Sequence, residues 1–355
     1  MKLTFARWGN YTIAFKALFE KLGLKVIPPE KTSSETIAEG AKIAPELYCF
    51  PLKVNLGNYL PAIKKGADTI FMVTSLGGSC RLRYYGAVQD KCLSEAGHKV
   101  NFIIFGQSPK DIYLKLKEVS GASFWQILKA AYFGLKELRF IEKLEKKGQY
   151  LRPREKKKGK TDTVLRETFF DLEKVKDLKE LSEFKKRTFK KISEIEIDNK
   201  RDIPKVALIG EIYTVSDSAI NFGVEEKLGR EGIEVHREMD TTYHLKKIIF
   251  PWKDWTIQRA INPYLRSTVG GHGRDAIYEM LKYIQKDFDG VIHLLPFGCM
   301  PEVTVRPILE KIHLQSGIPF LSLSLDEQVA EAGIDTRLEA FVDVVSNHYK
   351  MKHKT

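Results

Sequence analysis

Three of the four cysteines in this 355-residue chain lie in short loops that are rich in glycine or proline. Cys49 lies in PELYCFP (residues 45–51), Cys80 ends the loop SLGGSC after the apolar run 69–74, and Cys299 lies in PFGCMPE after the apolar run 290–295. Binding sites in open α/β sheets form beyond the carboxyl ends of the strands. Three thiolates that meet there could hold an iron–sulfur cluster and leave one iron open for a substrate.

Cysteines also have roles that need no metal. A free cysteine often only packs in the interior, and each of the three could do so. Their shared setting of glycine or proline loops, after a strand in two cases, favours the ligand role for Cys49, Cys80 and Cys299. Cys92 lies within an expected helix, and we interpret it as structural. Zinc is an alternative metal, but the chain contains no Cys-x-x-Cys pair, which structural zinc sites usually have.

Backbone amides beside the cysteines are candidates for contacts with a cluster. Gly77, Gly78 and Gly298 could donate N–H groups to its sulfides and so tune its potential. An iron that lacks a protein thiolate can act as a Lewis acid on a carbonyl or hydroxyl oxygen, and it can also pass electrons.

The pattern of apolar residues divides the chain into three parts. Residues 1–107 are expected to form an N-terminal α/β domain, 108–203 a helical, lysine-rich segment, and 204–355 a C-terminal α/β domain. Repeated strand–helix units imply parallel sheets with helices on both faces. In both α/β parts a buried strand runs into a glycine-containing loop with a cysteine, so two similar domains are expected to face each other. The expected strands are 2–5, 25–27, 69–74, 99–105, 206–209, 233–236, 291–295 and 320–323.

The middle part is expected to be helical throughout. Apolar spacing predicts helices over 111–144 and 172–192, with a basic stretch over 146–161 between them. A helical subdomain with a solvated, lysine-rich surface is the favoured interpretation. An RNA-binding patch is the alternative, so nucleic acid is not among the favoured partners.

Composition excludes several classes of protein. The chain is 43% hydrophobic and has a formal net charge of +12. It contains no apolar run long enough to span a membrane and no signal-peptide pattern. Four cysteines in a chain of this length do not make a disulfide framework. We therefore expect a cytoplasmic protein with no membrane partner.

Several motifs resemble those of one known family. These are the two cysteine motifs PELYCFP and PFGCMPE, GEIY at residues 210–213, and DE at 326–327 together with TRLEAF at 336–341. The chain resembles the 2-hydroxyacyl-CoA dehydratase component family, and more narrowly its CoA-substrate-specific enzyme activase-related proteins. The similarity covers both α/β parts, and the helical middle is less specific.

The resemblance implies a fold and a cofactor. Members of this family use two flavodoxin-like α/β domains, here with a helical insertion between them, to bind an iron–sulfur cluster through three cysteines. Cys49, Cys80 and Cys299 match these ligand positions. The implied cofactor is a [4Fe-4S] cluster or, as in some relatives, a double-cubane cluster.

The resemblance also implies a reaction and partners. A separate ATP-hydrolysing iron–sulfur activator supplies a low-potential electron, and the dehydratases remove water from a 2-hydroxyacyl-CoA through a ketyl radical. This chain would then be a dehydratase-type lyase or a cluster-dependent reductase that acts on a CoA thioester or another small molecule. A homodimer, or a heterodimer with a related subunit, is expected. A non-catalytic accessory or scaffold subunit is the alternative. No Gly-x-x-x-x-Gly-Lys-Ser/Thr loop is present, so intrinsic ATPase activity is not expected.

Charged side chains near the cysteines complete the set of candidates. Glu46 and Glu302 each lie three residues from a cysteine and could donate protons or cap a helix; capping is favoured for Glu302 because a helix N-terminus stabilises a carboxylate. Arg81 and Arg83 could contact a CoA phosphate or the anionic cluster. Glu211 could line the same cleft. Among these positions the catalytic group stays open.

Overall fold

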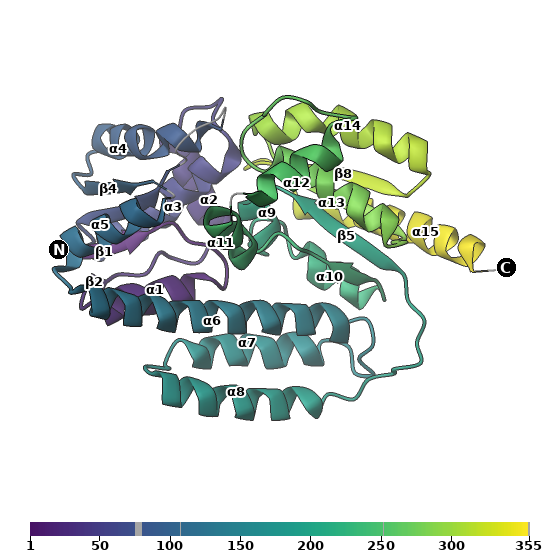
Figure 1. Ribbon diagram of the computed structural model, residues 1–355, viewed down its shortest axis with the longest axis horizontal. Coiled ribbons are helices and arrows are strands. Elements are labelled where there is room, and N and C mark those ends of the chain that lie inside the picture. The colour runs from purple at the N-terminus through teal and green to yellow at the C-terminus, as the bar shows by residue number, and fades with distance from the viewer. Residues whose placement is uncertain (75–79, 107, 251, 354–355) are drawn as a thin grey trace.

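The chain folds into two parallel sheets, each covered by helices, that lie side by side (Figure 1). The structure is a computed structural model that describes residues 1–74, 80–106, 108–250 and 252–353. The first sheet has the strand order β2-β1-β3-β4 and the second has the order β6-β5-β7-β8. The strands are β1 (Lys2–Phe5), β2 (Lys25–Val26), β3 (Thr69–Val73), β4 (Asn101–Phe105), β5 (Lys205–Gly210), β6 (Glu234–His236), β7 (Gly290–Pro296) and β8 (Phe320–Leu325).

This architecture confirms the predicted α/β fold with two parallel-sheet domains. All eight expected strands are found among the described residues, with ends that differ by at most two residues. Counted from the first strand of each half, both orders are 2-1-3-4, which is the order of the first four strands in a flavodoxin-like sheet. Strands β3, β5 and β7 read as continuous apolar runs because helices cover both faces of the sheets.

Helices of the first half lie on both faces of its sheet. Ser33 begins α2 with a capping box, in which its hydroxyl accepts from the Thr36 amide and the Thr36 hydroxyl accepts from the Ser33 amide. The helices are α1 (Thr12–Lys21), α2 (Ser34–Ile43), α3 (Phe50–Lys64) and α4 (Tyr85–Glu95), with a short 3-10 helix η1 (Arg81–Tyr84) before α4.

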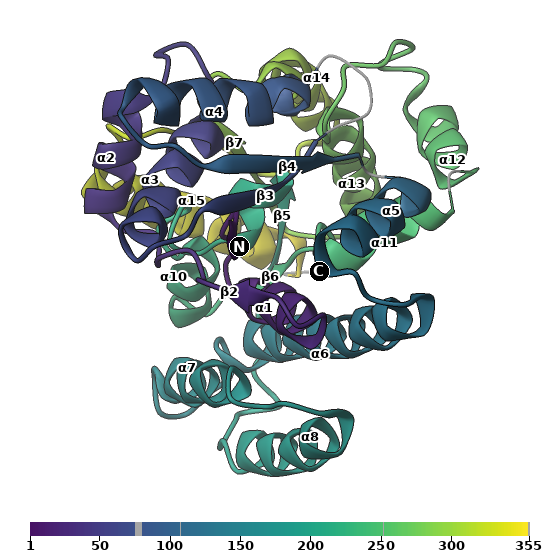
Figure 2. The same ribbon diagram turned by 90° about the vertical axis from the view of Figure 1, so that its left-hand side faces the viewer.

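The last three helices of the middle part form a layer below the two sheets, whereas the first one packs on the first sheet (Figures 1 and 2). The single helix expected over 111–144 is instead two helices. Gly121 ends the first in a left-handed conformation (φ 64°), and Ser123 caps the second. Asp177 caps the last helix of the layer, so this helix begins later than expected. The four helices are α5 (Pro109–Ser120), α6 (Phe124–Leu151), α7 (Lys160–Leu172) and α8 (Leu178–Ser193).

The second half contains two helices that the sequence did not predict, α11 (Thr241–Ile249) and α12 (Trp252–Ile261). The remaining helices are α9 (Ile212–Ser216), α10 (Val224–Arg230), α13 (Gly273–Gln285), α14 (Met300–Ser316) and α15 (Glu331–Lys352). The helix after α9 begins only at Val224, because Phe222 and Gly223 adopt left-handed conformations. None of the helices in the described ranges has the length and apolar character needed to cross a membrane.

Helix α3 lies between the two halves and is buried on nearly all sides. Leu52 and Leu56 pack into the core of the first half, whereas Phe50 and Val54 belong to the core of the second sheet. Polar contacts hold the same junction. The ammonium group of Lys53 forms an ion pair with Glu327, and the Tyr213 hydroxyl donates to Asn55 Oδ1 at 2.9 Å. The two cores are therefore joined through one helix.

We expect Gly57→Ala to destabilise the fold, because α2 and α3 approach too closely for a side chain. A Cβ atom at Gly57 would lie 1.7 Å from the Thr36 carbonyl oxygen, and one at Gly40 would lie 2.0 Å from the Lys53 oxygen. Both neighbours are backbone, so a helix must move. Overpacking of this kind costs about 3 kcal/mol or more, which thermal melting would detect.

Gly333→Ala is the matched control for this substitution. Gly333 lies in α15, and a Cβ atom there would meet nothing within 4 Å. Alanine is favoured over glycine inside helices by roughly 0.5 to 1 kcal/mol, so this variant should melt at the same temperature or higher. Equal melting temperatures for Gly57→Ala and the wild type would contradict the close approach of α2 and α3.

Glu137 in α6 gives the fold a predictable dependence on pH. Its side chain is fully buried between helices, and neither carboxyl oxygen has a hydrogen-bond partner among the described residues. Burial raises the pKa of Glu137 to about 8. The folded state therefore favours the protonated form, and this stabilisation is lost as the pH rises from about 4.5 through about 8.

Glu137→Gln should remove this loss. We expect the variant to melt several degrees above the wild type at about pH 9 and to differ little at about pH 5, since each kcal/mol corresponds to roughly 2 to 4 °C in a domain of this size. Glu167→Gln, at an exposed position of α7, is the control and should leave the profile unchanged. A pH profile of Glu137→Gln parallel to that of the wild type would refute this assignment.

Candidate functional site

The three loop cysteines occupy equivalent positions in the structure. Cys49 directly precedes α3, Cys80 directly precedes η1 and Cys299 directly precedes α14. Each is thus the N-cap residue of a helix with an extended backbone conformation. The N-terminus of a long helix carries partial positive charge and favours an anionic sulfur nearby, which applies most directly to α3 and α14.

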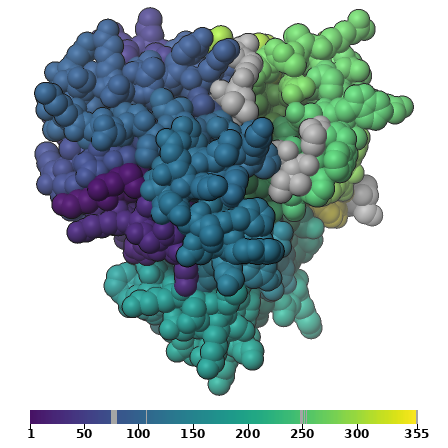
Figure 3. All heavy atoms as spheres, turned by 60° about the vertical axis from the view of Figure 1, so that its left-hand side comes forward, coloured from purple at the N-terminus to yellow at the C-terminus, as the bar shows by residue number. Residues whose placement is uncertain are grey.

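Backbone contacts bring the three cysteines to the seam between the two halves. The Phe50 amide donates to the Phe297 carbonyl oxygen at 3.2 Å, which joins the Cys49 loop to the Cys299 loop. A Cβ atom at Gly271 would lie 2.9 Å from Pro301 Cγ and 3.9 Å from Cys80 Sγ, so Cys80 also lies near the start of α14. Figure 3 shows this seam between the blue N-terminal and green C-terminal elements.

The topology explains why the seam is the site. The strand order reverses between β1 and β3 in the first sheet and between β5 and β7 in the second. In such sheets, ligands bind at these switch points, beyond the carboxyl ends of the strands. Cys80 follows β3, and Cys299 follows β7. Glu211 follows β5, at the switch point of the second sheet. Cys49 instead reaches the seam because α3 runs between the two halves.

The thiols are neutral in the metal-free protein. Burial raises the pKa of Cys49 to about 11 and that of Cys299 well above its ordinary value. The pKa of Cys80 is raised for the same reason. A metal must displace these protons before it can bind, so binding at this site is expected to strengthen as pH rises.

Glu211 is the carboxylate that all three thiols share. Electrostatic interaction with Glu211 adds to burial in raising the pKa of Cys49, of Cys80 and of Cys299. Its Oε2 accepts from the Thr214 amide and hydroxyl, both at 2.9 Å, which places it as the N-cap of α9. Burial of the carboxyl group raises the pKa of Glu211.

Glu302 lies at the third position of α14 and is completely buried. Its Oε2 is 2.9 Å from His293 Nε2, and the other ring nitrogen of His293 is 3.3 Å from Ser322 Oγ. This arrangement agrees with a carboxylate at a helix N-terminus, and His293 is fully buried beside it. Burial keeps Glu302 away from any substrate in solution, so a direct role as proton donor is not supported by this geometry.

The other candidates differ in their placement. Arg81 donates to the Leu47 carbonyl oxygen, and its guanidinium group lies 5.5 Å from the centre of the Tyr48 ring, so it bridges the Cys49 and Cys80 loops. Arg83 and Glu46 are exposed. Gly298 adopts a left-handed conformation (φ 73°) and packs on the backbone of the Cys49 loop. Gly77 and Gly78 lie outside the described residues.

Cys92 has a different environment. It lies within α4 and is 7% exposed. Burial raises its pKa, and the charged groups that affect it are Glu95 and Lys91 of its own helix rather than the loop cysteines. Cys92 belongs to the same buried cluster as Cys49 and Cys299, and both its structural role and the role of the other three cysteines as ligands stay predictions.

Within the ranges that the structure describes, no group of three or more His, Cys, Asp or Glu side chains could hold one metal ion. A cluster at the seam therefore stays a prediction. The cysteine ligands of a cubane each bind a different iron and therefore stand farther apart than the ligands of one ion. Three soft sulfur donors favour iron–sulfur clusters over magnesium or calcium.

Two residues of the site were missed by the sequence analysis. The Tyr85 hydroxyl lies 2.7 Å from Cys49 Sγ, although the two residues are 36 positions apart. His272 lies in a glycine-rich segment interpreted as a flexible loop, but it is the N-cap of α13 and interacts electrostatically with Glu211. No spacing in the sequence indicates either contact, since both arise from the packing of separate elements.

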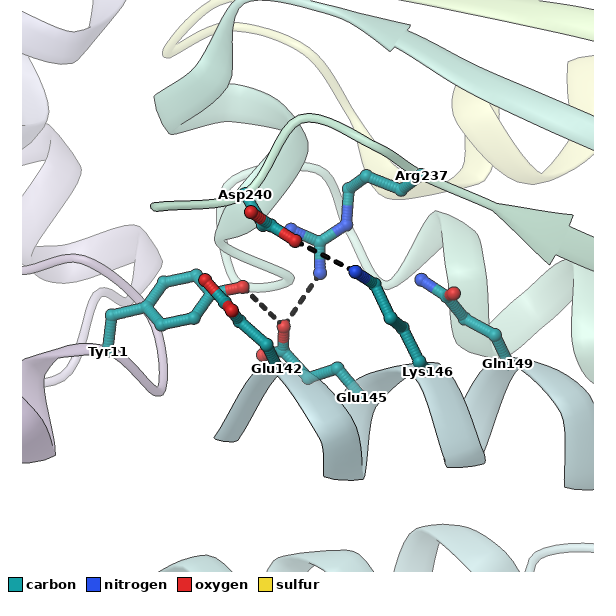
Figure 4. Close-up of a pocket in the computed structure, with 7 residues that line it drawn as sticks. All are labelled: Tyr11, Glu142, Glu145, Lys146, Gln149, Arg237 and Asp240. Atoms are coloured by element: carbon teal, nitrogen blue, oxygen red, sulfur yellow. Dashed lines mark hydrogen bonds and ion pairs between the residues drawn. The ribbon is translucent and has the colours of Figure 1, made fainter. Parts of the chain in front are cut away.

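A second polar cluster, between α6 and the segment after β6, has a structural role (Figure 4). Glu145 accepts from the Tyr11 hydroxyl at 2.7 Å and from Arg237 at 2.8 Å, and Lys146 donates to Asp240 at 3.0 Å. Because these charges satisfy one another, the cluster fastens the helical layer to both halves and leaves no group poised for chemistry.

The fold and the site define an α/β protein with two parallel sheets and a cysteine-lined seam between them. Residues 5–75 match a family described as CoA enzyme activase uncharacterised domain (DUF2229). This match agrees with the broad, activase-related family that the motifs indicate, and it includes Cys49 but neither Cys80 nor Cys299. No curated protein matches the chain.

We expect Cys80 to be the first thiol to react with iodoacetamide in the metal-free native protein. Cys80 is partly exposed, whereas Cys49, Cys92 and Cys299 are each no more than 8% exposed. All four thiols have raised pKa values, so the exposure of each sulfur to the reagent decides the order in which they react. Peptide mass mapping over time would show this order. Modification of Cys299 before Cys80 would contradict the geometry of the seam.

Proposed function

We propose that this chain is an iron–sulfur protein that resembles 2-hydroxyacyl-CoA dehydratase components. It takes low-potential electrons from an ATP-dependent activator and acts on a CoA thioester or another small molecule at an open cluster iron. The observation that carries the proposal is the position of Cys49, Cys80 and Cys299, which precede three helices at one seam. The family match over residues 5–75 supports a CoA enzyme activase-related system.

Each group at the seam has a defined task in this proposal. Cys49, Cys80 and Cys299 hold the cluster, and the N-termini of α3 and α14 offset its negative charge. When bound, the cluster supplies an electron and a Lewis-acidic iron for a substrate oxygen. Glu211 lies close enough to all three thiols to affect their pKa values. Arg81 supplies positive charge between the Cys49 and Cys80 loops.

Apolar side chains around the seam favour a protein partner. Contiguous exposed apolar surface often marks an interaction site. Here five exposed residues flank the three cysteines in sequence: Leu47, Tyr84, Phe297, Met300 and Val303. The activator and a related subunit are the partners proposed for this face. The same surface also suits an accessory subunit that holds a cluster without turnover.

Anaerobic reconstitution with iron and sulfide tests the proposal. The wild type should become brown and bind iron and sulfide in amounts near one cluster per chain. Cys80→Ser and Cys299→Ser should each lose most of the iron, because a serine hydroxyl replaces a soft thiolate poorly. Both variants should stay folded, since neither residue lies within a strand.

Cys92→Ser is the matched control and should keep the full iron content. It should lose a little stability, because it places a hydroxyl at a buried helical position. Colourless wild-type protein would refute the proposed function. Iron loss in Cys92→Ser with retention in Cys299→Ser would refute the ligand set. A cluster that forms but never reacts, alone or with its activator, would favour the accessory role.

A further inference from the structure

Cys49 differs from the other two seam cysteines in what faces its sulfur. The Leu82 amide faces the sulfur of Cys80, and the Glu302 amide faces the sulfur of Cys299; each lowers the pKa of the thiol it faces. The hydrogen-bond partner of Cys49 Sγ is a side chain, the Tyr85 hydroxyl, at an O–S distance of 2.7 Å.

The start of α3 explains why a side chain faces this sulfur. The Phe50 amide already donates to the Phe297 carbonyl oxygen, and Pro51 has no N–H group. The Leu52 amide donates to the carbonyl oxygen of Cys49 itself. The amides that usually serve an N-terminal ligand are therefore used elsewhere or missing, and a side chain takes their place.

Tyr85 is held so that its hydroxyl stays at this sulfur. It is 4% exposed and forms the first residue of α4. Its ring lies edge-on to Tyr48, with the ring centres 6.2 Å apart. A metal-bound thiolate has no proton to donate, so the phenol must be the donor.

We propose that Tyr85 is a positioning residue that sets the reduction potential of the cluster by donating a hydrogen bond to the Cys49 ligand sulfur. This inference rests on the proposed function. Hydrogen bonds to ligand sulfurs are a recognised control on cluster potentials. A donor draws electron density from the sulfur and stabilises the reduced form, so removing it makes the cluster harder to reduce.

Tyr85→Phe tests the inference, because it removes the hydroxyl and keeps the ring. The measurement is the midpoint potential of the reconstituted protein, followed by electron paramagnetic resonance during an anaerobic redox titration. We expect a more negative potential, with the ratio of oxidised to reduced cluster at a fixed potential about tenfold higher, or about 59 mV for a one-electron couple. Iron content should stay at the wild-type value.

Tyr59→Phe is the matched control. Tyr59 is fully buried in the same core as Tyr85, but its hydroxyl donates to Met72 Sδ at 3.6 Å rather than to a cysteine. It should leave the potential unchanged. No shift in Tyr85→Phe, or an equal shift in both variants, would overturn the inference and leave the proposed function intact.

Two further outcomes distinguish a failure of the Tyr85 inference from a failure of the proposed function. If Cys49→Ser retains the cluster at the wild-type potential, Cys49 is not a ligand and the inference fails, while a cluster on other residues remains. If the wild type binds no cluster, the proposed function fails and the inference fails with it.

Discussion

The structure depends on the burial of helix α3 between two sheets. One face of this helix packs with Leu52 and Leu56 in the first core, and another places Phe50 and Val54 in the second. Its contact with α2 is so close that Gly40 and Gly57 leave no room for a Cβ atom. A helix fixed on this many sides cannot tilt without disturbing both cores. The position of its N-terminus, where Cys49 lies, is therefore fixed by both cores.

Two opposing electrostatic effects meet at this point. Burial disfavours thiolates, and the nearby Glu211 disfavours them further. Helix N-termini, backbone amides and the Tyr85 hydroxyl favour them. Without a metal the first group of effects prevails, and the thiols keep their protons. A bound cationic centre would oppose burial and favour the sulfur anions.

The fold could be predicted from the sequence because its parallel strands are buried on both faces. Runs such as residues 69–73 and 291–295 are almost entirely apolar and buried, with Thr69 and His293 as their polar members. Helices α11 and α12 were missed, since they lie in a segment whose apolar spacing did not stand out. The break between α5 and α6 was missed because Gly121 was treated as an ordinary helical residue, whereas its left-handed conformation ends the helix.

The site could be predicted only in part. Cys80 and Cys299 follow strands, and strand ends at a switch point are identifiable from the order of elements. Cys49 was identified from its loop, although it follows a helix rather than a strand. Tyr85 could not be found, because its contact depends on how α4 packs against the start of α3. His272 was missed for a similar reason: a glycine-rich run resembles a loop until a helix is seen to begin there.

The long separation of Cys299 from the other two cysteines fixes the order in which the site can form during synthesis. The first half can fold as soon as its strands have left the ribosome, and it then presents Cys49 and Cys80 alone. Only after β7 and α14 have emerged can the Phe297 carbonyl accept from the Phe50 amide and bring Cys299 to the seam. Domains generally fold as units, the N-terminal one first. The third thiol is therefore the last to arrive, and a chain that stops short of it has an open, two-thiol site.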